Sequence, residues 1–220
     1  ANSIRGFVSA ACGNIGASVG NLVSDGSKER TLNVFEELFS VRFFIASIVC
    51  FGILRLSSPF VSLWIGTEYI LQQSNILLLT IGIFISITRI TVDDYTYALG
   101  LFQDTWAPVT EAIINITISV LMGHYFGVNG VLCGGIVSQI IIVLIWKPYF
   151  LFSVGLNESI VQYILMYLKH LFTFILCYLI SSIVIGKIPW LPSENLRCWI
   201  VCGITYCLIF GCILFACLYG

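Results

Sequence analysis

A polytopic α-helical membrane protein is the fold class that the sequence predicts, and three observations lead to it. Hydrophobic residues make up 59% of the 220 residues and charged residues only 10%, whereas charged residues make up about 25% of an ordinary soluble domain. The mean hydropathy is +1.01. Seven apolar stretches are long enough to cross a hydrocarbon core about 30 Å thick, which takes roughly 20 helical residues. We therefore expect an all-α integral membrane bundle of about seven transmembrane helices.

The predicted spans follow one another closely and leave no room for a soluble domain. They lie near residues 4–22, 36–56, 75–99, 108–126, 128–150, 165–186 and 197–219. The tryptophans fall in or beside the span ends and linkers, as in the aromatic belt of a membrane protein; they are Trp64, Trp106, Trp146, Trp190 and Trp199. The linker segments 28–38 and 59–66 are either short helices lying in the membrane interface or plain connectors.

The start of the chain predicts a fragment. It carries no initiator methionine and no signal peptide, and it opens directly into a span. Ser9, Gly13 and Ala17 recur at every fourth position of this first span, which lets neighbouring helices approach closely. We therefore expect an upstream part of the protein to pack against it.

Charge and cysteine content exclude several classes of function. Ten basic and eleven acidic residues give a net charge of -1, so no nucleic-acid partner is expected. Five of the nine cysteines lie in the last span without the histidines and carboxylates that complete a metal site. His124 and His170 stand alone, without the partners of a catalytic triad. No metal, cofactor or enzyme activity is predicted.

Polar residues inside the spans are the candidates for function. Ser86, Arg89 and Asp93 share one face of the third span, and Arg89 and Asp93 are spaced to pair. An arginine near the centre of a span costs about 2.5 to 3.5 kcal/mol to insert, so Arg89 is expected to face protein or water. The alternative is that the segment lies close enough to the membrane surface to snorkel.

Three further residues complete the candidate set. Glu111 and Asn115 share a stripe of the fourth span with Ser119, which either lines a cavity or packs against a neighbouring helix. Glu111 follows Pro108 closely and also suits a helix start, where a negative charge complements the helix dipole. Arg42 lies near enough to the preceding Glu36 and Glu37 to pair with either at the interface.

Several motifs in order along the chain resemble one membrane protein family. They are Gly100 to Asp104 (GLFQD), Glu111 to Ile116 (EAIINI), Gly127 to Gly135 (GVNGVLCGG) and Lys147-Pro148, preceded by Gly13 to Asn21 (GNIGASVGN) and Leu63 to Gly66 (LWIG). This set is similar to the polysaccharide exporters of the multidrug/oligosaccharidyl-lipid/polysaccharide flippase superfamily. The likeness covers nearly the whole chain.

The resemblance implies a larger protein and a transport activity. Family members have twelve to fourteen helices in two lobes, so this chain would be the C-terminal half and the N-terminal lobe would lie upstream. The implied activity is flipping of a polyprenyl-diphosphate-linked oligosaccharide repeat unit across the bacterial inner membrane, in O-antigen or capsule biosynthesis. The bilayer and the lipid-linked oligosaccharide are the implied partners, and other polysaccharide-assembly proteins are further ones. A buried diphosphate needs cationic partners, for which Arg89, Arg42 and Arg5 are the candidates.

Other functions stay open at the level of sequence. A cation-coupled multidrug exporter or a peptidoglycan-precursor flippase of the same superfamily would share this helix plan. A membrane polymerase or acyltransferase of polysaccharide assembly would be an enzyme, and the short loops count against it. An accessory membrane subunit is a further alternative.

Overall fold

The computed structural model describes residues 28–188 and 192–219, and these fold into helices joined by short connections. The main helices are α3 (Lys28–Trp64), α4 (Gln73–Ala98), α5 (Trp106–Phe126), α6 (Val128–Ser138), α7 (Lys147–Phe150), α8 (Ile160–Ile185) and α9 (Leu196–Tyr219). Two π-helical segments, η3 (Gln139–Trp146) and η4 (Leu151–Leu156), flank α7, and two short 3-10 turns are η1 (Thr67–Tyr69) and η2 (Phe102–Asp104). The predicted all-α class is confirmed.

Six helical runs in the described part of the chain are long and apolar enough to cross a membrane. They are Lys28–Trp64, Gln73–Ala98, Phe102–Phe126, Val128–Leu156, Ile160–Ile185 and Leu196–Leu218. This pattern fits a multi-pass membrane protein. The predicted first span at 4–22, the motif at Gly13 to Asn21 and the candidate Arg5 lie outside the described residues.

The second predicted span and both interfacial segments belong to one long helix. α3 runs without interruption from Lys28 to Trp64 and contains Pro59. The separate short helix expected at 28–38 is therefore wrong, and so is the separate surface segment at 59–66, most of which is the end of α3. At 1.5 Å per residue, 37 residues span about 55 Å, well beyond a hydrocarbon core of about 30 Å. Hydropathy located the apolar middle of this helix and missed its more polar ends.

The fifth predicted span also proves longer than expected, and the sixth begins earlier. The helical run from Val128 continues through both π-helical segments to Leu156, so the connection expected between the spans 128–150 and 165–186 shrinks to a few residues. Asn157 takes a left-handed conformation, with φ of 50°, that ends the run. Asparagine adopts this conformation more readily than most residues. The Ser159 side chain then accepts a hydrogen bond from the Val161 amide and caps α8.

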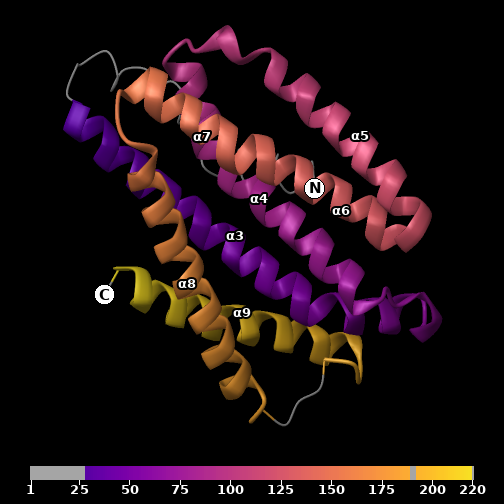
Figure 1. The fold of residues 1–220 in the computed structure, drawn as a ribbon. Helices are drawn as coiled ribbons and strands as arrows, with labels where there is room; N and C mark the ends of the chain where they lie inside the picture. The colour runs from indigo at the N-terminus through magenta and orange to yellow at the C-terminus, as the bar shows by residue number, and fades with distance from the viewer. Residues whose placement is uncertain (1–27, 189–191, 220) are drawn as a thin grey trace.

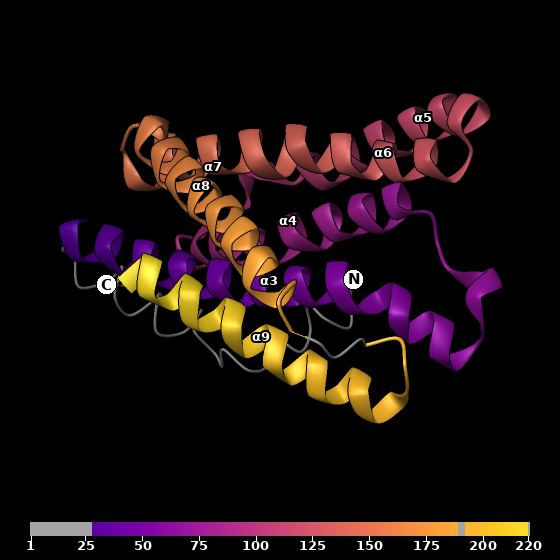
Figure 2. The same cartoon turned by 90° about the horizontal axis from the view of Figure 1, so that it is seen from below.

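The helices are arranged in a row with one crossing helix. α5 packs mainly on α6, α6 on α4, α4 on α3, and α3 on α9. Figure 1 and Figure 2 show this order, with the α5–α6 pair on one side of α3 and α9 on the other. α8 crosses the row and packs on α9 and α3. The long faces of α5 that do not contact α6 carry exposed apolar side chains such as Val109, Ile116 and Val120.

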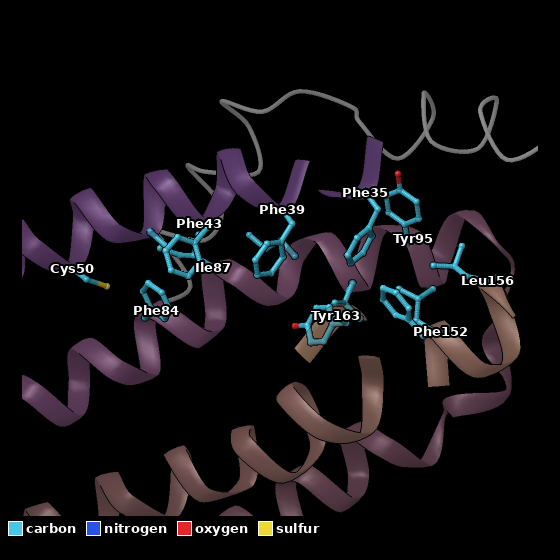
Figure 3. Packing of buried hydrophobic residues seen from close by; sticks show 14 residues of the cluster. Phe35, Phe39, Phe43, Cys50, Phe84, Ile87, Tyr95, Phe152, Leu156 and Tyr163 are labelled. Atoms are coloured by element: carbon cyan, nitrogen blue, oxygen red, sulfur yellow. The ribbon is translucent and has the colours of Figure 1, made fainter. Parts of the chain in front are cut away.

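An aromatic core joins α3, α4, η4 and α8. Phe35, Phe39 and Phe43 follow one another at every fourth position of α3, so they form a stripe on one face. Phe35 meets Tyr95 of α4 edge-on with ring centroids 5.0 Å apart, and Phe39 meets Tyr163 of α8 at 5.9 Å. Figure 3 shows these rings pointing into the space between the helices. Edge-to-face pairs of this kind add to the stability gained by burial.

A second core holds α9 against α3 and α8. Phe51 of α3 and Phe210 of α9 are both fully buried and stack with ring centroids 4.3 Å apart. Cys177 and Cys202 are buried in this apolar cluster, as expected for cysteines that act as small apolar residues. Both residues therefore contribute to this core as small, buried side chains.

The glycine stripe of α6 serves close packing against α5. A side chain at Gly130 would meet the Met122 carbonyl oxygen at 2.0 Å, and one at Gly134 would meet the Ser119 amide nitrogen at 2.6 Å. Backbones this close leave no room for a β-carbon. Gly130 and Gly134 therefore serve the packing of α6 against α5.

Candidate functional site: a buried charge cluster

Arg89 and Asp93 lie one turn apart on α4 and form the ion pair that their spacing predicts. The Arg89 Nε donates to Asp93 Oδ2 at 3.0 Å. The Arg89 side chain is only 13% exposed, so it packs against protein as expected. A charge buried in this way requires partners, because desolvation of an unpaired ion costs several kcal/mol.

Lys147 brings a second cation to the same carboxylate. Its Nζ donates to Asp93 Oδ1 at 2.7 Å from the first residue of α7. Asp93 therefore bridges a lysine and an arginine with its two oxygens. In the sequence, Lys147 belongs to a family motif and was not among the predicted site residues. No spacing signal links residues 54 positions apart, and only the packing of α7 on α4 joins them.

Glu111 completes this group from a third helix. Its Oε1 accepts a hydrogen bond from Arg89 Nη1 at 3.4 Å. The helix-start interpretation is wrong, because α5 begins at Trp106 and has no acidic residue in its first turn. The chain Lys147–Asp93–Arg89–Glu111 thus ties α7, α4 and α5 together.

Arg42 of α3 forms a neighbouring ion pair on α4. Its Nη2 donates to Asp94 Oδ2 at 2.5 Å, and its Nη1 donates to the Thr91 hydroxyl at 3.2 Å. The pairing expected with Glu36 or Glu37 is wrong. Both glutamates are exposed on α3, whereas the Arg42 side chain is buried against α4.

Together the two groups form a charge cluster, which we define as Arg42, Arg89, Lys147, Asp93, Asp94 and Glu111. Three cations face three carboxylates, so the formal charge of the cluster is zero. A balanced and hydrogen-bonded set is the form in which ionic side chains are tolerated away from water. Asp93 and Asp94 lie toward the C-terminal end of α4, and Glu111 lies in the second turn of α5. Lys147 is the first residue of α7, between η3 and η4.

A polar pocket of ≈ 270 Å³ adjoins the cluster. Asp93 and Lys147, which form an ion pair, are among its lining residues. The rest of the lining comes from the end of α4 and the loop into α5, and consists of Thr96, Tyr97, Leu101, Phe102, Asp104, Thr105 and Pro108. Asp104 accepts a hydrogen bond from the Trp146 indole at 2.8 Å, which fixes this loop against η3. A ligand in the pocket would directly meet the ion pair between Asp93 and Lys147.

The remaining two candidates lie outside the charge cluster. The Ser86 hydroxyl donates to the Gly82 carbonyl oxygen and accepts from Gln139 Nε2 at 3.2 Å, which links α4 to η3 one turn before Arg89. Asn115 is exposed on α5, and its side-chain oxygen accepts from the Ser119 hydroxyl. The structure therefore joins three of the six predicted residues, Arg89, Asp93 and Glu111, by ion pairs, and it pairs Arg42 with the adjacent Asp94.

Comparisons with known proteins give no further information about this site. Neither a family model, nor a curated protein, nor a solved structure matches this chain.

Proposed function

We propose that this chain belongs to a transporter that flips a polyprenyl-diphosphate-linked oligosaccharide repeat unit across the bacterial inner membrane, for the synthesis of a cell-surface polysaccharide such as O-antigen or capsule. The observation that carries the proposal is the charge cluster beside the polar pocket, with Lys147 and Asp93 shared between them. The order of the sequence motifs supports the same family of transporters. The six helical runs that are long and apolar enough to cross a membrane also support a protein that acts within a bilayer.

The cations of the cluster suit the diphosphate of such a substrate. A diphosphate entering the pocket would meet the Lys147 ammonium first and the Arg89 guanidinium behind Asp93. Phosphate oxygens can take the place of carboxylate oxygens as hydrogen-bond partners of both cations, because the two anions accept from guanidinium and ammonium groups in the same way. Because each cation keeps an anionic partner during this exchange, no unpaired cation is left in the membrane, where it would be costly.

The two halves of the cluster have different roles in this proposal. The chain Lys147–Asp93–Arg89–Glu111 adjoins the pocket and serves binding and its coupling to helix movement. The Arg42–Asp94 pair does not line the pocket and serves to hold α3 against α4. Substitutions in the first group should therefore change transport, and substitutions in the second should change stability.

Variants of the intact protein test the proposal by a transport readout. Arg89→Ala and Lys147→Gln are expected to reduce surface glycan on immunoblots and to raise the pool of undelivered lipid-linked repeat unit, with normal membrane insertion. Lys169→Gln is the matched control, because Lys169 is an exposed cation on α8. Surface glycan at the wild-type level in both variants, at normal protein abundance, would refute a transport role for these cations. Loss of drug efflux with unchanged glycan would point instead to the multidrug exporters.

A further inference from the structure

A second cavity, apolar and separate from the charge cluster, lies between α3, α4, η3 and α8. Its volume is ≈ 260 Å³. Its lining is almost entirely hydrocarbon, and consists of Cys50, Leu54, Leu77, Thr80, Ile81, Phe84, Ile85, Ile140, Leu144, Tyr167, Leu171 and Phe174. None of these residues lines the polar pocket.

The two short polar side chains in the lining are already satisfied by the backbone. The Thr80 hydroxyl donates to the Ile76 carbonyl oxygen at 2.7 Å, and the Cys50 thiol contacts the Thr80 carbonyl oxygen at 3.6 Å. A water molecule needs two to four polar partners to be held in a cavity. An apolar cavity of about 150 Å³ stays dry and takes up benzene, so this larger space favours a longer hydrocarbon.

The position of the cavity along the helices restricts what can enter it. Cys50, Leu144 and Phe174 lie near the middle of α3, of the run Val128–Leu156 and of α8 respectively. If these helices cross a bilayer, their midpoints lie at the depth of lipid chains, where a charged headgroup is disfavoured. Leu77, Ile81 and Ile140 are exposed at the bundle surface, so the cavity opens sideways on α4 and η3.

We propose that this cavity is a lipid-binding site that holds an acyl chain of a bilayer phospholipid. Acyl chains are the most abundant hydrocarbon at that depth, and abundance sets occupancy by mass action. Filling the space also restores dispersion contacts that its lining would otherwise lack. The site is distinct from the proposed transport site, so the two proposals can fail independently.

A pair of neighbouring substitutions on η3 tests the site. Leu144→Trp places an indole in the cavity, whereas Ile145→Trp places the same group on an exposed position of the next residue. The whole chain is purified from membranes in mild detergent, and its bound lipids are quantified by mass spectrometry. Loss of the burial of only two methylenes weakens binding about tenfold, so Leu144→Trp is expected to retain about tenfold less phospholipid than the control. Equal retention by the two variants would overturn the proposal.

A second variant and a cross-linking measurement cover the case in which Leu144→Trp does not fold. Ile81→Phe adds less volume at the mouth of the cavity, and Leu79→Phe is its exposed control outside the lining. The wild-type chain is reconstituted in phosphatidylethanolamine and phosphatidylglycerol vesicles that contain a phospholipid with a diazirine midway along one chain. Cross-links are expected on peptides that contain Cys50, Phe84 or Phe174, and to decrease in Ile81→Phe alone. Cross-links confined to outer faces, or recovery of a polyprenyl lipid in place of phospholipid, would contradict the assignment.

Discussion

The Arg42–Asp94 pair allows a quantitative prediction because its two partners differ in burial. The Arg42 side chain is 3% exposed and the Asp94 side chain 27%. Removal of one member of a buried pair leaves the other charge without compensation, at a cost of about 3 to 5 kcal/mol. Asp94→Leu leaves the more deeply buried charge, on Arg42, without its carboxylate partner. The loss in free energy of unfolding should therefore approach this range.

The reverse substitution is expected to cost less. In Arg42→Met the carboxylate left behind is partly exposed, so the loss is close to that of one charge-assisted hydrogen bond, about 1.5 to 3 kcal/mol. The second bond of Arg42, to Thr91, contributes only about 0.6 kcal/mol, the average measured for side-chain bonds between membrane helices. The expected difference between the two single variants is thus about 1 kcal/mol.

The double variant completes the cycle. Arg42→Met with Asp94→Leu leaves no stranded charge, so it should be more stable than Asp94→Leu alone, and the two changes should not add. The free energies of unfolding are measured in mixed micelles of mild detergent and sodium dodecyl sulfate, followed by tryptophan fluorescence. Additive losses, or an Asp94→Leu variant no less stable than Arg42→Met, would refute the argument from burial.

Two further predictions concern packing. Gly130→Ala is expected to lower the free energy of unfolding by about 1 to 3 kcal/mol, the usual cost of overpacking, because the new methyl group would lie 2.0 Å from the Met122 carbonyl oxygen. Gly135→Ala has only one side-chain atom at 4.0 Å and should leave stability unchanged in the same titration; equal effects would contradict the close α5–α6 contact. Phe210→Ala removes a fully buried ring and should cost about 3 to 5 kcal/mol. Leu208→Ala, on an exposed position of the same helix, should cost less than about 0.5 kcal/mol, and a comparable loss there would count against the α9 core.

Local patterns predicted the local part of the candidate site. Arg89 and Asp93 are one helical turn apart, so their ion pair follows from helix geometry once α4 is recognised. The burial of Arg89 was also predictable, because a charge within an apolar span is expected to face protein or water. The pairing of Arg42 was predicted wrongly, because its partner was sought among the nearest acidic residues on its own helix, whereas Arg42 pairs with Asp94 of α4.

Lys147 shows most clearly what sequence patterns could not supply. It lies between two π-helical segments. In a π-helix the backbone hydrogen bonds join residues five positions apart, so the side chains are rotated relative to those of an ordinary α-helix. Side-chain directions in such segments therefore depart from the period of 3.6 residues per turn. The contact of Lys147 with Asp93 therefore became visible only with the structure.

The sequence by itself determined that this chain is helical and where most of its apolar helices lie, because hydropathy and chain length act locally along each span. It also determined the pairing of Arg89 with Asp93. The tertiary structure decided how far the helices extend beyond the predicted spans, as in α3, and which side of each helix faces a neighbouring helix. It alone brought Arg42 to Asp94 and Lys147 to Asp93, since a charge that is removed from water must find its partner on whichever helix packs beside it.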